Sequence, residues 1–297
     1  MMNENLKAHI YVVVAAILIA GSFLASKQLS GVLHPISLTL YRFVVAMGLL
    51  LPFLLFKKDV IKRVLKVLPK AMVVSLFYAL YFIGMFKALE STTVLNTGII
   101  YTLVPLMTAI LCIFFFKEYI ALGQFFIYLL GIVATIIVVF RADVGLLLSF
   151  SLHSGDIIFF LASLSMSLYP IFLKILYDKK EDIIILVFST LLGGSLWMFL
   201  AMLVLDIPFE WQKIDKELLY AMLYLVVATT IFTLFLYQKA TLILGPKKVM
   251  AYVYINPALV AIIAFLFHGE VVSFGVLSGI VISSFATFMI LKQSHTK

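Results

Sequence analysis

One arginine is embedded in an otherwise apolar stretch of this sequence. Arg42 lies about seven residues inside the apolar run 35–56. A charge placed within a membrane span is costly and usually has a function. The planar guanidinium would bind a substrate carboxylate through paired hydrogen bonds. The alternatives are that Arg42 extends to the outer lipid headgroups or forms a structural ion pair.

Two prolines, Pro105 and Pro257, lie near the middle of apolar runs and have polar residues around them. Proline removes one helical hydrogen bond and displaces the carbonyl four residues earlier. We expect kinks here that shape a cavity and flex during transport, with static packing kinks as the alternative. The side chains predicted either to line that cavity or to bond neighbouring helices are Tyr78, Tyr81, Asn96, Thr97, Tyr101, Thr102, Thr229, Thr230, Thr233, Tyr237, Tyr252, Tyr254 and Asn256. Trp197 is added because its ring would stack on a flat substrate.

Carboxylates occur only near the ends of the apolar runs. Glu118, Glu270 and Asp156 each stand at the start of one, where the helix dipole favours a negative charge. We therefore predict helix caps, with proton coupling as the alternative, shallow in the case of Asp156. Since no carboxylate lies deep in a run, a deep acidic proton relay is not expected.

The motifs of enzymes are missing from the sequence. It has no His-Glu-x-x-His zinc motif, no Gly-x-Ser-x-Gly nucleophile turn and no phosphate-binding glycine loop. Cys112 is the single cysteine, so neither an internal disulfide nor a cysteine-rich metal site is possible. We expect no catalysis, no metal and no cofactor.

The composition sets the class of protein that must position these residues. Of the 297 residues 64% are hydrophobic and 12% charged, and the mean hydropathy is +1.19. Soluble domains carry about 25% charged residues, whereas a membrane-spanning helix needs about 20 apolar residues. We therefore predict an all-α polytopic membrane protein with ten spans, near 9–27, 35–56, 69–87, 93–116, 120–140, 154–176, 183–205, 218–238, 247–267 and 271–291.

Basic residues between the spans predict the orientation. With the N-terminus inside, the inner segments hold 16 Lys and Arg and the outer segments hold 5, as the positive-inside rule requires. Both termini are then cytoplasmic, and the net charge of +8 reflects basic loops rather than nucleic-acid binding. The segment 57–70 is expected to be a basic loop, with an amphipathic helix on the membrane surface as the alternative.

The second half of the chain repeats features of the first at an offset of 152 residues. Pro105 and Glu118 correspond to Pro257 and Glu270, and Lys87-Ala88 corresponds to Lys239-Ala240. Two repeats of five spans follow, over 1–145 and 146–297. Because five is odd, the second repeat enters the membrane from the opposite side, as in the inverted repeats of many transporters.

These features together resemble the EamA family of the drug/metabolite transporter superfamily. The resemblance rests on Gly21-Ser22-Phe23 with Lys27, on Pro35 with Arg42, and on the two Pro–Glu pairs. It implies two EamA-type repeats in the cell inner membrane, and export or exchange of amino acids or other small metabolites through a central cavity. A passive channel and an intramembrane enzyme are the competing functions. The expected partners are the lipid bilayer and a small-molecule substrate, without nucleic acid. We expect a monomer, with a homodimer as the alternative.

Overall fold

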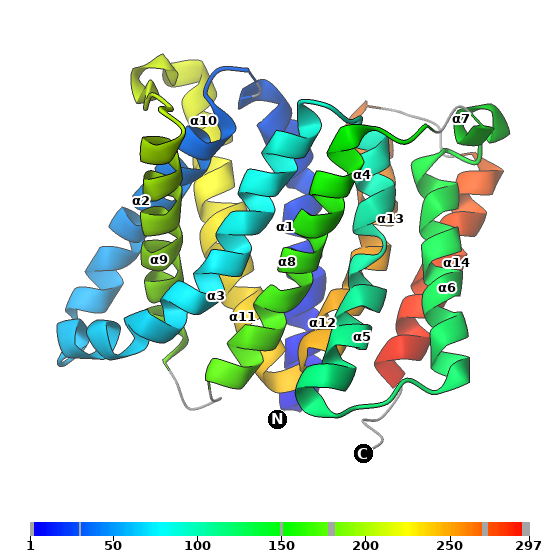
Figure 1. Ribbon diagram of the computed structural model, residues 1–297, viewed down its shortest axis with the longest axis horizontal. Coiled ribbons are helices and arrows are strands. Elements are labelled where there is room, and N and C mark those ends of the chain that lie inside the picture. The colour runs from blue at the N-terminus through cyan, green and yellow to red at the C-terminus, as the bar shows by residue number, and fades with distance from the viewer. Residues whose placement is uncertain (1–2, 30, 149–150, 178–181, 269–272, 293–297) are drawn as a thin grey trace.

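The protein is a bundle of helices (Figure 1). The computed structural model describes residues 3–29, 31–148, 151–177, 182–268 and 273–292, and within these it contains no strand. Its helices are α1 (Glu4–Leu29), α2 (Pro35–Leu55), α3 (Val60–Leu89), α4 (Val94–Tyr101), α5 (Val104–Phe116), α6 (Leu122–Val139), α7 (Val144–Leu148), α8 (Ser154–Leu176), α9 (Ile183–Val204), η1 (Trp211–Lys213), α10 (Lys216–Val226), η2 (Val227–Phe232), α11 (Thr233–Leu244), α12 (Pro246–Ala251), η3 (Tyr252–Ile255), α13 (Asn256–His268) and α14 (Phe274–Lys292).

Nine helical segments of the described chain are long and apolar enough to cross a membrane. They coincide with nine of the ten expected spans. The remaining one, expected at 247–267, is not among the nine, and the structure divides it into α12, the 3₁₀ turn η3 and α13. The division falls immediately before Pro257, whose ring cannot continue a regular α-helix.

The helical column of α4 and α5 is interrupted in the same way. α4 ends at Tyr101 and α5 begins at Val104, so that Pro105 occupies its first turn, where a missing N–H costs nothing. A third column, α10–η2–α11, contains a π-helical turn at η2. The three irregular columns are therefore those of the fourth, eighth and ninth expected spans.

The segment 57–70 differs from the expected loop. α3 begins at Val60 and continues to Leu89, so most of this basic segment forms the first turns of a long helix. Its apolar residues alternate with lysines at helical spacing, and Ile61 and Leu65 remain more than 60% exposed. These turns therefore combine an apolar face with a basic face, the pattern of a helix at a membrane surface.

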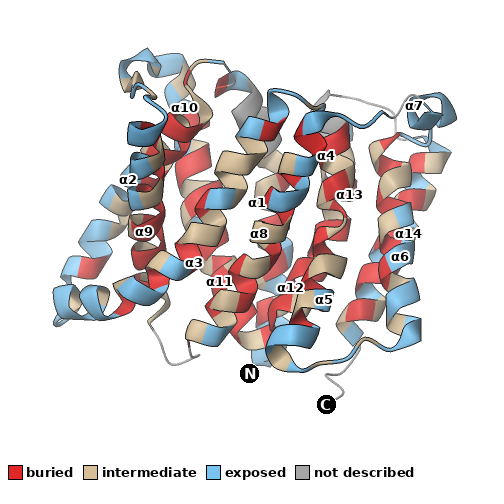
Figure 2. Cartoon of the chain, in the orientation of Figure 1, coloured by how far each residue is buried: buried red, intermediate tan, exposed pale blue. Residues whose placement is uncertain are grey.

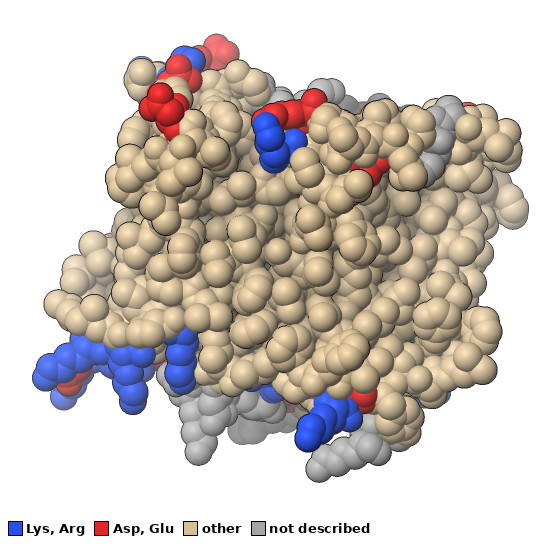
Figure 3. Space-filling model, in the orientation of Figure 1, with Lys and Arg blue, Asp and Glu red and all other residues tan. Residues whose placement is uncertain are grey.

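Charge separates the two ends of the bundle. The start of α1 and the end of α14 lie at the same end (Figure 1). Figure 3 shows Lys and Arg gathered at this end, below the first turns of α3, with acidic side chains more prominent at the opposite end. The surface between the two ends is almost free of charge in this view. We refer to the end with the termini as the basic end.

Small residues allow the helices to approach closely. α3 packs on α8 and α9, α2 packs on α9, and α6 packs on α14. A Cβ added to Gly84 would lie 2.8 Å from that of Ala162, and one added to Gly279 would lie 2.8 Å from Val138. Figure 2 shows the buried residues between the helices, while large apolar side chains such as Phe114 face outward. Such a surface suits lipid rather than water.

Candidate functional site

Arg42 is held between the two halves of the chain. Its Nη2 donates hydrogen bonds to Oγ1 of Thr230 at 3.0 Å and to Oγ1 of Thr229 at 3.3 Å. Both threonines belong to the π-helical turn η2, 187 and 188 residues further along the chain. The contact therefore joins α2 to the α10–η2–α11 column.

The π-helical turn explains why two consecutive threonines reach one nitrogen. In a regular α-helix, neighbouring side chains point about 100° apart. Here the hydroxyls of Thr229 and Thr230 both donate back to the carbonyl of Leu225, at 2.9 and 2.8 Å. Their oxygens are thereby left as acceptors for Arg42. Isolated π-helical turns are frequent at functional sites.

The hydrogen bonds to the two threonines leave much of the Arg42 guanidinium unused. Its Nε is buried and has no hydrogen-bond partner among the described residues. The described carboxylates form no ion pair with it, and Tyr78 is the titratable group that interacts with it electrostatically. Arg42 is therefore a cation inside the bundle without a described counter-ion, although its side chain is only half-buried.

Tyrosines gather next to Arg42. Tyr78 on α3 packs against Tyr169 on α8 with ring centroids 5.1 Å apart, and Tyr81 packs against Tyr101 at 5.9 Å. Tyr237 on α11 packs with Tyr101 against the same cluster of buried residues. We call these five residues the tyrosine cluster. Arg42 and four of its five members were predicted from the sequence as cavity residues, and the fold brings them together.

Tyr169 is the member that the sequence reasoning missed. It is 3% exposed, and its hydroxyl accepts a hydrogen bond from Nε2 of Gln238 at 3.1 Å. Gln238 also donates to Thr190 at 3.0 Å. A signal was present, because Tyr169 directly precedes Pro170, just as the other candidates surround Pro105 and Pro257.

Asp156 and Asn96 form a second polar cluster, away from the basic end. Oδ2 of Asp156 accepts from Nδ2 of Asn96 at 2.8 Å and from the backbone N–H of His153 at 2.7 Å, while Thr92 donates to Oδ1. Asn96 also donates to the carbonyl of Ser151 at 2.8 Å. We call Asp156, Asn96 and Thr92 the Asp156 cluster. It joins the starts of α4 and α8.

The remaining predicted residues have contacts of their own. Nε1 of Trp197 donates to the carbonyl of Met72 at 3.0 Å, which fixes α9 to α3. The hydroxyl of Tyr252 is 2.9 Å from Nδ1 of His9. Thr97 is buried in α4, and Asn256, at the start of α13, has a buried Oδ1 without a partner in the described structure.

Comparison with known proteins decides the family. The EamA-like transporter family matches residues 6–140 and 153–292. The chain belongs to the EamA-like transporter family. This confirms the resemblance inferred from the sequence. Together with the apolar helices, family membership makes the chain a multi-pass membrane protein.

Two further similarities extend the comparison of this EamA family member. It is 26% identical to the uncharacterized transporter YdfC of Bacillus subtilis (strain 168) over 196 residues, which cover 66% of this chain and 62% of that protein. A solved structure, described only as a crystal structure of a protein, matches with a TM-score of 0.76 and 15% identity over 96% of each chain. The second similarity concerns the fold alone.

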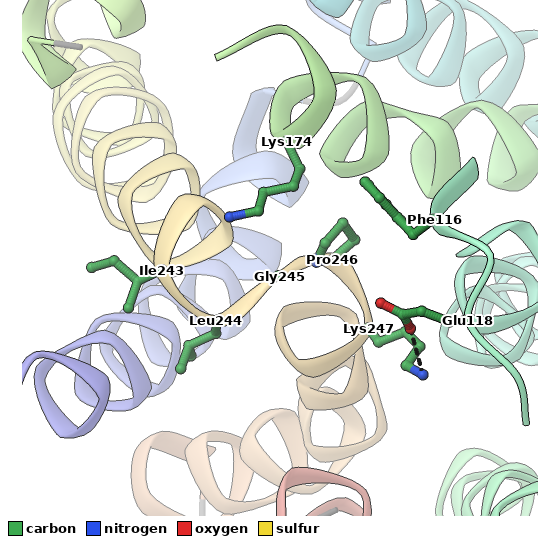
Figure 4. A pocket seen from close by; sticks show the side chains of 8 residues that line it. All are labelled: Phe116, Glu118, Lys174, Ile243, Leu244, Gly245, Pro246 and Lys247. Carbon is green, nitrogen blue, oxygen red and sulfur yellow. Dashed lines mark ion pairs between the residues drawn. The ribbon is translucent and has the colours of Figure 1, made fainter. Parts of the chain in front are cut away.

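A pocket of about 310 Å³ opens near the basic end, where α5, α8, α11 and α12 come close (Figure 4). Nζ of Lys247 forms an ion pair with Oε2 of Glu118 at 2.7 Å, and Nζ of Lys174 donates to the carbonyl of Leu242 at 2.6 Å. Glu118 thus connects the segment after α5 to α12. Its predicted counterpart, Glu270, lies outside the described residues.

The described residues contain no group of three or more His, Cys, Asp or Glu side chains placed to hold a metal ion. The family and the name of its relative point to transport rather than catalysis. The chemistry available at Arg42 and the tyrosine cluster is therefore recognition, through hydrogen bonds, charge and aromatic surfaces.

Proposed function

We propose that this protein is a secondary transporter that exports or exchanges small metabolites, such as amino acids or related compounds, by alternating access. The observation that carries the proposal is the position of Arg42 and the tyrosine cluster. They are contributed by α2, α3 and α4 from residues 1–145 and by α8, η2 and α11 from residues 146–297. A site formed by both halves changes its access when one half moves against the other.

The arrangement of helices supports two inverted repeats of five spans. α5 and α13 begin and end 152 residues apart, and α4 and α12 begin at the same offset, as do α6 and α14. The packing agrees with this correspondence. In the first repeat α3 and α5 pack on α8, the first helix of the second repeat. In the second repeat α11 and α13 pack on α1, the first helix of the first repeat. α6 and α14 lie side by side and run in opposite directions (Figure 1). On this proposal α12, η3 and α13 together form the ninth span.

The charge distribution supports the predicted orientation. The basic end carries the start of α1, the end of α14 and the exposed basic residues at the start of α3 (Figures 1 and 3). We place this end in the cytoplasm of a cell whose inner membrane holds the protein. The pocket beside Glu118 and Lys247 then faces the cytoplasm.

The test is counterflow in liposomes that contain the purified protein, with a mixture of radiolabelled amino acids and organic acids outside. A carrier takes up label faster when the liposomes are preloaded with unlabelled substrate. Unsaturable uptake without stimulation by preloading would indicate a channel. Failure to take up any compound, relative to protein-free liposomes, would contradict the proposed class of substrates.

A further inference from the structure

The charges around Arg42 are unbalanced. Arginine stays protonated in proteins, and a buried charge without a partner is strongly disfavoured. Nevertheless, the part of the chain that the structure describes places no carboxylate against Arg42. The balancing charge is therefore to be sought in a ligand.

The hydrogen bonds of Arg42 indicate the shape of that ligand. Of the five N–H groups of a guanidinium, the two on Nη2 are directed at Thr229 and Thr230. Nε is buried without a partner in the described structure, and the described residues accept hydrogen bonds from Nη2 but none from Nη1. Up to three N–H donors thus remain, on Nε and Nη1, and an N–H of this charged group donates a strong, charge-assisted hydrogen bond to a carboxylate oxygen.

Two lysines on α11 and α8, the helices that carry Tyr237 and Tyr169, have contacts of their own. Nζ of Lys239 lies 5.4 Å from the ring centroid of Tyr11 and 5.6 Å from that of Phe235. Lys174 donates to a backbone carbonyl near the basic end. A single unit of positive charge therefore remains at Arg42. A monoanion neutralises it, whereas a dianion would leave a net buried negative charge.

The surroundings of Arg42 are aromatic. Tyr78, which interacts with it, stacks on Phe43 with centroids 5.9 Å apart and contacts Phe82 edge-on at 5.0 Å. Such rings favour a flat apolar body. Asp156 is already bonded to Asn96, and no carboxylate of the described chain interacts with Arg42, so none is placed here to hold an ammonium group.

We propose that Arg42 and the tyrosine cluster bind an organic monocarboxylate with an aromatic or other flat apolar body, in preference to its neutral, zwitterionic or dianionic analogues. This rests on the proposed function, which it narrows from small metabolites to one class of substrate. Arg42 binds the carboxylate, Thr229 and Thr230 orient Arg42, and the tyrosines contact the body of the ligand.

The experiment measures ligand binding in detergent, through thermal stabilisation and calorimetry. Four probes share one ring and differ at a single carbon: phenylacetate, phenylacetamide, phenylglycine and phenylmalonate. A ligand that binds the folded state raises its apparent stability. Phenylacetate is expected to bind most tightly, and each of the other three at least tenfold more weakly.

Variants connect this binding to Arg42. Arg42→Gln keeps hydrogen-bonding capacity but removes the charge, and is expected to weaken phenylacetate binding about tenfold to hundredfold. Arg42→Lys keeps the charge without the planar fork and should be intermediate. The control is Arg141→Gln, an identical replacement at an exposed position at the opposite end from the termini, which should leave binding unchanged.

Equal binding of phenylacetate and phenylacetamide would overturn the inference, as would phenylacetate binding that survives in Arg42→Gln or is absent from the wild-type protein. The proposed function fails separately, because binding in detergent requires no transport. If the protein binds phenylacetate but shows no counterflow, only the proposed transport function is contradicted. If the protein exchanges neutral solutes without binding phenylacetate, only the proposed preference for monocarboxylates is contradicted.

Discussion

Arg42 and the Asp156 cluster are two charged regions in an apolar bundle, and they differ in how far the protein satisfies the charge. Asp156 is 5% exposed and accepts hydrogen bonds from Thr92, Asn96 and the backbone of His153. Arg42 is only half-buried, bonds to two threonines, and keeps a buried Nε without a described partner.

This difference suggests different roles for the two regions. A carboxylate with its acceptor positions filled by neighbouring donors joins helices and has little capacity left for a ligand. A cation with unused donors costs stability, which indicates a role in function rather than in folding. The number of hydrogen-bond partners therefore distinguishes a structural charge from a recognition site better than the exposed fraction of the side chain does.

The largest expected effect is that of Arg42→Gln on transport. Because the charge that holds the substrate is lost, the counterflow rate per folded protein should fall more than tenfold. The thermal stability of the unliganded protein should be unchanged or higher, since an unbalanced charge is removed. Counterflow and thermal denaturation are measured on the same preparation, with Arg141→Gln as control. Normal transport would make Arg42 a structural residue.

Asp156→Ala should show the reverse pattern. Removing the carboxylate leaves the donors of Asn96 and Thr92 without their acceptor, and we expect a loss of about 2 kcal/mol of stability. Transport per folded protein should change little. Asp143→Ala, which affects only the cap of the five-residue helix α7, is the control for thermal denaturation. Loss of transport with normal stability would instead support proton coupling through Asp156.

Thr230→Val tests whether the π-helical turn orients Arg42. The substrate KM should rise by about threefold to tenfold while the maximal rate is retained, and Thr229→Val, with the longer hydrogen bond, should have the smaller effect. Thr241→Val on α11 is the matched control, because its buried hydroxyl has no described partner. An equal effect of all three variants would argue against a specific role for η2.

The smallest effect is expected at Asp182, a carboxylate near the basic end, outside the spans. Burial alone would raise its pKa, but hydrogen bonds from Lys57 and the Ile184 N–H and the charges of Lys57 and Arg63 hold the pKa below its usual value. The folded state therefore gains stability above about pH 4 and loses it as the pH falls through the lowered pKa. Asp182→Asn should cost about 0.5 kcal/mol at neutral pH. The stability of the Asp182→Asn variant should also fall less on acidification than that of the wild type, as measured by thermal denaturation.

Particular residues show how far sequence reasoning reached. It selected Arg42, Tyr78, Tyr81, Tyr101 and Tyr237 because polar groups in apolar runs are rare, and rarity is visible without a fold. The same criterion selected Asn96, whose amide is bonded to Asp156 and Ser151 in the Asp156 cluster. The criterion finds polar groups, but it does not show which of them already have partners.

The interruptions of the helices also differ in how far the sequence predicts them. Pro105 and Pro257 lack an N–H and disfavour a continuous helix, which agrees with the breaks beside them. Local chemistry is not sufficient, however, because Pro52, Pro69 and Pro170 lie inside uninterrupted helices. The π-helical turn at η2 contains no proline, and its threonines bond to Leu225 and Arg42. The side chain that this turn contacts lies 188 residues away in the sequence.

The sequence by itself determined the membrane class, nine of the expected spans, the offset of 152 residues and the family. These are properties of hydropathy and spacing, which add up residue by residue along the chain. Only the tertiary structure decided that Arg42 meets Thr229 and Thr230, that Tyr169 joins the tyrosine cluster, and that Asp156 is saturated while Arg42 is not. Such pairings depend on how each helix is rotated and packed against its neighbours, and close packing fixes that rotation jointly for the whole bundle.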